Sequence, residues 1–185
     1  IKRECFVPME NRDIAYVGEH IQIGNHRVIL DSRTLAKMLD AVDVTDSELV
    51  LDVGSGYGYS AAIIAHLAEA VVALESEDKP ANEMQNALID HGIDNVIVER
   101  GPLFCGAESH APYDVIFVQG GVELMPDEIL TQLKEGGRIV AIFMQGSLGS
   151  VKIGYKLNNE ISWRFAFNAG APVLDGYKKE MTFRF

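Results

Sequence analysis

The sequence is poor in cysteine, in basic residues and in long apolar runs, and each shortage narrows the possible functions. Its two cysteines, Cys5 and Cys105, lie far apart and form no CxxC pair, which argues against a disulfide framework and is typical of a reducing compartment such as the cytoplasm. Acidic residues outnumber basic ones by 27 to 16, for a formal net charge of -11. Such a surface repels nucleic-acid phosphates and anionic lipids. No stretch of the sequence approaches the roughly 18 apolar residues of a membrane span.

What remains is the composition of an ordinary globular protein. Hydrophobic residues make up 48% and charged residues 23% of the 185 residues, and this length suits one domain with a single sizeable core. We therefore expect one domain over residues 1–185, located in the cytoplasm, with no nucleic-acid or membrane partner. The chain begins at Ile1 rather than Met, and we expect a native N-terminal segment to precede it. The sequence leaves the oligomeric state open.

From residue 48 onward, segments typical of strands alternate with segments typical of helices. Short apolar runs predict the strands, and longer Ala- and Leu-rich segments predict the helices. The expected order is strand 48–53, helix 57–68, strand 70–75, helix 79–91, strand 95–99, strand 113–118, helix 126–134 and strand 138–143. This alternation predicts an α/β fold with a doubly wound, mostly parallel sheet of the Rossmann-like kind.

Shorter signals mark the ends of elements and the two flanks of this unit. A helix is predicted over 33–42, with Asp31 or Ser32 as its N-cap, and Gly92 stands where a left-handed residue would end helix 79–91. Glycines at 136–137 should stop helix 126–134. Beyond residue 150 the aromatic residues alternate at 163, 165 and 167, and apolar residues alternate at 181, 183 and 185. These patterns predict two or three antiparallel strands at the C-terminus.

A glycine-rich loop joins the first predicted strand of the unit to the helix after it. Its sequence is Asp52-Val53-Gly54-Ser55-Gly56-Tyr57-Gly58, which lets the backbone turn tightly and approach a ligand closely. The dinucleotide fingerprint G-x-G-x-x-G would need its third glycine at Tyr59, so a nicotinamide site fits less well. A P-loop is excluded because no Gly-Lys-Ser/Thr follows.

Two acids frame the loop. Glu75 ends the next predicted strand, where a carboxylate can accept two hydrogen bonds from a ribose diol. Asp52 precedes the first glycine, where a carboxylate would repel a pyrophosphate but would suit a ligand that carries an ammonium and a sulfonium group. The combination favours a nucleoside such as S-adenosylmethionine over the alternative, a plain turn with a solvent-facing acid. No histidine has metal-ligand spacing with cysteines or acids, so no metal is expected.

At these residues the chain resembles the class I methyltransferases and, among them, the protein-L-isoaspartate O-methyltransferase family. The glycine motif with its helix, residues 51–62, and the segment Leu133-Lys134-Glu135-Gly136-Gly137 are similar to motifs that many methyltransferases share. The stretch Arg3-Glu4-Cys5-Phe6-Val7-Pro8 resembles the entry segment of the isoaspartyl family, and Ile23-Gly24 resembles the start of its substrate loop. The similarity extends over nearly the whole chain.

The resemblance implies a protein-repair reaction. A methyl group would pass from S-adenosylmethionine to a carboxylate oxygen of an isoaspartyl residue in a protein or peptide, leaving S-adenosylhomocysteine. The loop 24–32 would meet the acceptor, within a substrate-side segment 1–48, a cofactor-binding core 49–143 and C-terminal strands 144–185. The residues expected to bind the cofactor are Asp52, Gly54, Ser55, Gly56, Gly58 and Glu75.

The chain also departs from the family pattern, mostly on the acceptor side. Leu30 stands where the family has its catalytic serine, so no catalytic residue is assigned. Pro102 follows Gly101 where the family has an acid that meets the adenine, and Gln119-Gly120-Gly121 replaces small residues after the fourth strand. Two alternatives therefore stay open: a catalytically silent module that binds S-adenosylmethionine, and a methyltransferase with a different acceptor.

Overall fold

A seven-stranded sheet forms the centre of the computed structural model, which describes residues 1–24 and 26–179. The strand order is β5-β4-β3-β6-β7-β8-β9. The strands are β3 (Leu49–Val53), β4 (Ala70–Glu75), β5 (Val96–Arg100), β6 (Tyr113–Val122), β7 (Leu133–Gln145), β8 (Leu148–Leu157) and β9 (Glu160–Asn168). Strands β3 to β7 pair in parallel, whereas β8 and β9 pair antiparallel. The predicted fold class is confirmed.

Helices cover both faces of the sheet and create two apolar cores. On one face α1 (Ser32–Val42), α2 (Tyr59–Ile64) and α3 (Asp78–Asp90) pack on the strands, together with the N-terminal turn η1 (Arg3–Phe6). On the other face lie α4 (Asp127–Thr131), the turn η3 (Leu103–Cys105) and residues of the C-terminal segment such as Leu174 and Tyr177. Strands buried on both faces explain the continuous apolar runs in the sequence. None of the helices in the described part of the chain is long and apolar enough to cross a membrane.

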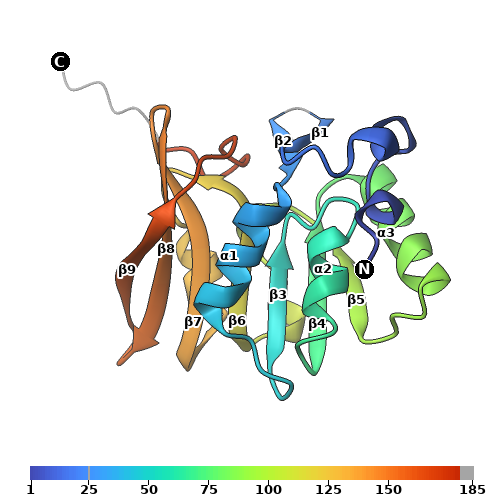
Figure 1. Ribbon diagram of the computed structural model, residues 1–185. Helices are drawn as coiled ribbons and strands as arrows, with labels where there is room; N and C mark the ends of the chain where they lie inside the picture. Colours follow the sequence, from blue (N-terminus) through green and yellow to red (C-terminus); the bar gives the residue numbers. More distant parts are fainter. Residues whose placement is uncertain (25, 180–185) are drawn as a thin grey trace.

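A small hairpin lies outside this sheet, at the edge where the parallel strands end. It consists of β1 (Ile21–Gly24) and β2 (Arg27–Ile29), paired antiparallel. Figure 1 shows the hairpin beyond the end of the sheet toward which β3 points. Ligands of open α/β sheets bind at this edge, so the hairpin lies beside the place where the sequence predicts a cofactor.

Several local predictions are confirmed. Asp31 caps α1, because its side chain accepts a hydrogen bond of 2.9 Å from the Thr34 amide. Gly92, one residue beyond the C-cap His91 of α3, has a φ of 66°, the left-handed conformation expected at a helix end. The strand predicted over 70–75 matches β4.

The helix predicted over 126–134 is shorter, and this prediction was wrong at its C-terminal end. α4 ends at Thr131, and Leu133 already pairs with Tyr113 as the first residue of β7. The two glycines that were expected to stop the helix lie inside β7, where the register shifts by several residues before Arg138. Pairing with a neighbouring strand therefore outweighs the local helix signal, a tertiary effect that no local pattern encodes.

The helix predicted over 57–68 is shorter as well, because α2 spans only Tyr59–Ile64. His66 and Leu67 instead donate to carbonyls three residues earlier, the tighter pattern of a fraying helix end. At the C-terminus β8 and β9 confirm an antiparallel pair, but Phe165 is 63% exposed and not part of the expected sheet core. A bulge in β9 next to Phe165 alters the alternation there. The third strand predicted around residues 181–185 lies outside the described residues.

Candidate cofactor site

The predicted glycine loop lies at the point where the strand order reverses. β3 has β4 on one side and β6 on the other. The connections that leave β3 and β6 therefore run in opposite directions along the sheet, and the crevice between them is the usual ligand site of such folds. Gly54, Gly56 and Gly58 have φ values of 80°, 59° and 90°, a region that other residues rarely adopt. At Gly58 a side chain would also collide with α3, because a Cβ there would lie 2.6 Å from Met84 Cγ.

Asp52 organises the loop from inside. Its side chain is fully buried, and Gln119 Nε2 donates to its Oδ1 at 2.8 Å. Ser55 Oγ and Ser60 Oγ donate to its Oδ2 at 2.8 and 2.6 Å. Burial raises the pKa of Asp52, and the three hydrogen bonds oppose that rise. Each oxygen of Asp52 is thus already bonded to the chain itself, and contact between Asp52 and a cofactor stays a prediction.

The backbone amides of the loop are also largely bonded within the chain. The amides of Gly54 and Ser55 both donate to the Leu74 carbonyl, at 2.9 and 3.2 Å. The Gly56 amide donates to Glu75 Oε2 at 2.8 Å. These bonds fasten the loop to the end of β4, and they place Glu75 against the middle of the glycine motif.

Glu75 is fully buried and carries an ion pair that the sequence did not predict. Arg27 from β2 donates from Nη1 to Glu75 Oε1 at 3.0 Å and from Nη2 to Oε2 at 2.7 Å. The amides of Ser76 and Glu77 donate to Oε1 at 2.7 and 3.0 Å. Burial alone would raise the pKa of Glu75, but the hydrogen bonds and the charge of Arg27 hold it below its ordinary value.

The acceptor-side position of the family serine is occupied by an apolar side chain. Leu30 is fully buried in the core that α1 and α2 share, and its carbonyl accepts a hydrogen bond of 2.8 Å from Arg3 Nη2. Ser32 is exposed as the first residue of α1. Neither residue therefore presents a hydroxyl at the place where the resemblance expects one.

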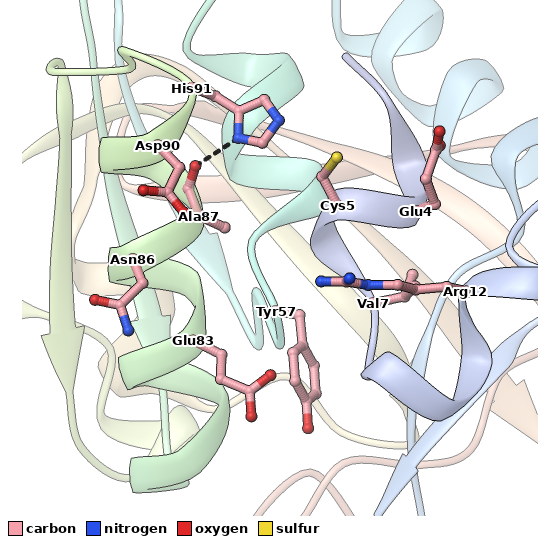
Figure 2. A pocket seen from close by; sticks show the side chains of 10 residues that line it. All are labelled: Glu4, Cys5, Val7, Arg12, Tyr57, Glu83, Asn86, Ala87, Asp90 and His91. Carbon is pink, nitrogen blue, oxygen red and sulfur yellow. Dashed lines mark hydrogen bonds between the residues drawn. The ribbon is translucent and has the colours of Figure 1, made fainter.

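Two cavities flank the loop. One, of about 260 Å³, lies beyond the ends of β4 and β5, and its lining includes Arg27, Ser76, Pro102 and Phe104. The other, of about 410 Å³, lies between the N-terminal turns and α3, with Tyr57 of the loop in its wall. Figure 2 shows side chains of α3 facing those of the N-terminal segment across this second cavity. The first cavity lies next to Glu75, through Ser76 in its lining, and the second lies next to the glycine loop, through Tyr57.

The family model of protein-L-isoaspartate(D-aspartate) O-methyltransferase (PCMT) matches residues 1–162. The chain belongs to this family. A protein-L-isoaspartate O-methyltransferase 2 of Anaeromyxobacter sp. is 38% identical to this PCMT-family chain over 153 residues, which are 83% of the chain and 62% of the relative. The corresponding protein of Polaromonas sp. is 38% identical over 140 residues, which are 76% of the chain and 66% of the relative. The chain thus spans less than two thirds of either relative.

Solved structures of the PCMT family share the fold. A protein-L-isoaspartate O-methyltransferase with 25% identity superposes with a TM-score of 0.82, covering 96% of this chain and 59% of the other. A Plasmodium falciparum protein of the same description, crystallised with S-adenosyl-L-homocysteine, has 19% identity and a TM-score of 0.78 over 94% of this chain and 85% of the other. The second likeness shows that the two proteins have the same fold.

Sequence reasoning missed Arg27 and Ser60, and it left open whether Gln119 reaches the loop. Gln119 does reach it, through its bond to Asp52. Arg27 had a signal: it is a charged residue at the head of the apolar run Val28-Ile29-Leu30, and it is buried with them. A charge buried in such a run requires a partner, and that partner lies 48 residues away at Glu75.

Proposed function

We propose that this PCMT-family chain is an S-adenosylmethionine-dependent methyltransferase acting on a carboxylate of isoaspartyl residues in proteins or peptides. One observation carries the proposal. The glycine loop and Glu75 meet at the switch point of the family's fold, joined by the bond from the Gly56 amide to the Glu75 carboxylate. The names of its relatives and the S-adenosyl-L-homocysteine in the Plasmodium falciparum structure support the same assignment.

The residues at this edge fit a nucleoside in type and position. Glu75 is the acid at the end of β4, and the neighbouring cavity is bounded by Ser76, Pro102 and Phe104, a mixture of polar and flat apolar groups suited to a ribose and a base. We assign Glu75 to the ribose hydroxyls, and Gly54, Ser55, Gly56 and Gly58 to the methionine part. In this proposal Asp52 acts mainly by holding the loop, because its oxygens already accept hydrogen bonds from Gln119, Ser55 and Ser60.

The chemistry asks little of the protein beyond positioning. S-adenosylmethionine supplies an electrophilic methyl group on a sulfonium and leaves as S-adenosylhomocysteine. A carboxylate is already ionised and nucleophilic at neutral pH, so the chain needs no general base. Its task is to hold the acceptor oxygen in line with the methyl group, and such alignment can supply a large part of the rate enhancement. We assign this task to residues 24–32, within the substrate-side segment 1–48.

The remaining assignments of segment and location belong to the same proposal. Residues 49–143 would bind the cofactor and residues 144–185 would complete the sheet, although the structure has β7 running through the boundary at 143 to Gln145. We propose a cytoplasmic location and a protein or peptide substrate with isoaspartyl residues.

The first test is methyl transfer from labelled S-adenosylmethionine to an isoaspartyl peptide, with the matched aspartyl peptide as the control, using the full-length protein. Selective labelling of the isoaspartyl peptide is the expected result, and it would show that the family serine is dispensable here. Labelling of neither peptide, by protein that binds S-adenosylhomocysteine in a titration, would contradict the proposed acceptor.

Glu75 can be tested separately from the acceptor. Glu75→Ala should remove most of the affinity for S-adenosylhomocysteine, measured by calorimetric titration, because the ribose loses its hydrogen-bond acceptor. The exposed acid Glu160 at the start of β9 provides the control Glu160→Ala. A folded Glu75→Ala protein that binds as tightly as the parent would remove Glu75 from the site.

One observation favours a second function, the catalytically silent binding module. Leu30 is buried and apolar where the family has its serine. If the chain descends from an enzyme that lost activity, methyl transfer to the isoaspartyl peptide should be measurable in Leu30→Ser and not in the parent. Labelling by both proteins would instead rule out the silent module. Labelling by neither, together with labelling of another carboxyl compound in a mixed-acceptor screen, would favour a methyltransferase with a different acceptor.

A further inference from the structure

Arg27 occupies the carboxylate that the proposed function assigns to the ribose. Its two terminal nitrogens contact the two oxygens of Glu75 separately, at 3.0 and 2.7 Å, and Nη1 also donates to Ser76 Oγ at 3.1 Å. The side chains of Arg27 and Glu75 are 7% and 0% exposed. A two-pronged pair of this kind is the strongest contact that a guanidinium makes with a carboxylate.

The pair leaves Glu75 without acceptor capacity. A carboxylate offers about four lone-pair directions, and five N–H donors already point at the two oxygens. They are Arg27 Nη1, Arg27 Nη2 and the amides of Gly56, Ser76 and Glu77. Without Arg27, three amide donors would remain on these four directions, so a place for a ribose hydroxyl opens only when Arg27 leaves. Arg27 and a ribose therefore cannot both bond to Glu75.

The rest of the hairpin is packed on the glycine loop at the same place. A Cβ at Gly56 would lie 2.8 Å from Ile23 Cδ1 and 3.8 Å from Ile29 Cγ1, so both side chains lie against this glycine. A Cβ at Gly54 would lie 3.5 Å from Arg27 Nη2. The hairpin thus fills the space over two of the three glycines proposed to contact the cofactor.

From these contacts we propose that Arg27 competes with the cofactor for Glu75, so that a nucleoside binds only when the β1–β2 hairpin moves the guanidinium away. The inference rests on the proposed function, which is what places a ribose at Glu75. Because the hairpin leads directly into Leu30, cofactor binding and the position of the acceptor loop become coupled through Arg27. The apparent affinity for the cofactor is then the intrinsic affinity multiplied by the fraction of molecules in which the hairpin is displaced.

The pair is also suited to exchange. Arg27 Nε is buried and has no hydrogen-bond partner among the residues that the structure describes, and an unsatisfied buried donor makes the present position of the side chain less favourable. Burying two charges costs desolvation energy that offsets much of their attraction. A ligand that supplies a hydroxyl to Glu75 can therefore replace the arginine without overcoming the full attraction of an isolated ion pair.

The test is calorimetric titration of S-adenosylhomocysteine into the full-length parent and the Arg27→Met variant, which keeps a similar stem but no donors. Arg27→Met should bind at least about tenfold more tightly, or ~1.4 kcal/mol. The matched control is Arg164→Met, at an exposed arginine of β9, which should bind like the parent. In Arg27→Met/Glu75→Gln most of the gain should vanish, because a glutamine amide offers one acceptor oxygen where the carboxylate offers two, and its NH2 group only donates.

The other outcomes show whether the competition alone is wrong or whether the proposed function is wrong as well. Equal or weaker binding by Arg27→Met, with clear binding by the parent, overturns the competition and leaves the proposed function standing. A gain that persists undiminished in the double variant also overturns it, because the effect then does not pass through Glu75. Absence of binding by both the parent and Arg27→Met overturns the proposed function and the competition together. If Arg27→Met does not fold, Arg27→Lys decides: it keeps the charge without the two-pronged contact and should bind more tightly than the parent, and equal or weaker binding overturns the proposal.

Discussion

The glycine loop and the β1–β2 hairpin meet at Glu75, but different forces hold them in place. The loop is fixed by polar contacts: Asp52 accepts from Gln119, Ser55 and Ser60, and loop amides donate to the end of β4. The hairpin and the residue after it are fixed by burial of apolar side chains, with one ionic contact from Arg27.

The glycine loop contains the residues that resemble the family pattern, and the segment after the hairpin contains a residue that departs from it. The acids and glycines of the loop match the family pattern, and they bond mainly to one another and to adjacent strands. Leu30, which stands where the resemblance expects the family serine, lies directly after the hairpin and is part of the core. The loop therefore keeps its shape by its own hydrogen bonds, whereas the hairpin packs over it.

The largest effect should come from breaking the contact between the two regions. Glu75→Gln leaves the buried charge of Arg27 uncompensated and should lower the free energy of unfolding by about 3–5 kcal/mol. Arg27→Met/Glu75→Gln should recover most of the loss, because no unpaired charge remains. Urea unfolding measures both. A single variant as stable as the parent would show that the pair is not formed in solution.

A smaller loss of stability is expected when the buried side chain of Leu30 is removed. Leu30→Ser removes a fully buried side chain and should lower the free energy of unfolding by about 2–5 kcal/mol, through lost burial and the cavity left behind. Leu157→Ser is the matched control, because Leu157 is 65% exposed and should change stability by less than about 0.5 kcal/mol. Similar losses in both variants would contradict the burial of Leu30.

Next comes the backbone of the loop itself. Gly58→Ala forces a side chain into a backbone φ of 90° and against Met84. The contact with Met84 should lower the free energy of unfolding by about 1–3 kcal/mol beyond the cost of the backbone strain. Gly92→Ala isolates the strain, because Gly92 also has a positive φ but no atom within 4 Å of a new Cβ, and it should cost about 1–2 kcal/mol. Thermal unfolding compares the two. Equal costs would mean that Met84 gives way freely.

The smallest effect is a dependence on pH. The pKa of Glu75 lies below its ordinary value of 4.5, so its ionisation stabilises the fold fully above that value and the stabilisation is lost as the pH falls through the folded-state pKa. The difference in the free energy of unfolding between the parent and Glu75→Gln should be constant from about pH 7 to about pH 5 and should narrow at lower pH. The total narrowing should be about 1.4 kcal/mol for each unit by which folding lowers the pKa of Glu75. Urea titrations over a pH series measure the difference, and a difference that stays constant in acid would contradict a lowered pKa.

Much of the fold follows from patterns within short stretches. The apolar runs of β3 and β4, the cap of α1, the tight turn at glycines 54, 56 and 58 and the left-handed Gly92 are set by neighbouring residues. The sequence predicts each of them, although it left the cap open between Asp31 and Ser32. The position of Glu75 beside the glycine loop also follows, because adjacent parallel strands end at the same edge.

Contacts between distant residues were decided only by the tertiary structure. Pairing of Leu133 with Tyr113 shortened the helix predicted over 126–134, and the bond from Gln119 joined Asp52 across 67 positions. Arg27 met Glu75 across 48 positions. The sequence by itself determined which residues form the glycine loop, because their conformations depend on local sterics and hydrogen bonds. Only the packing of the hairpin on the sheet edge decided that Arg27 covers it, because a buried charge takes its partner from whatever the fold brings within reach.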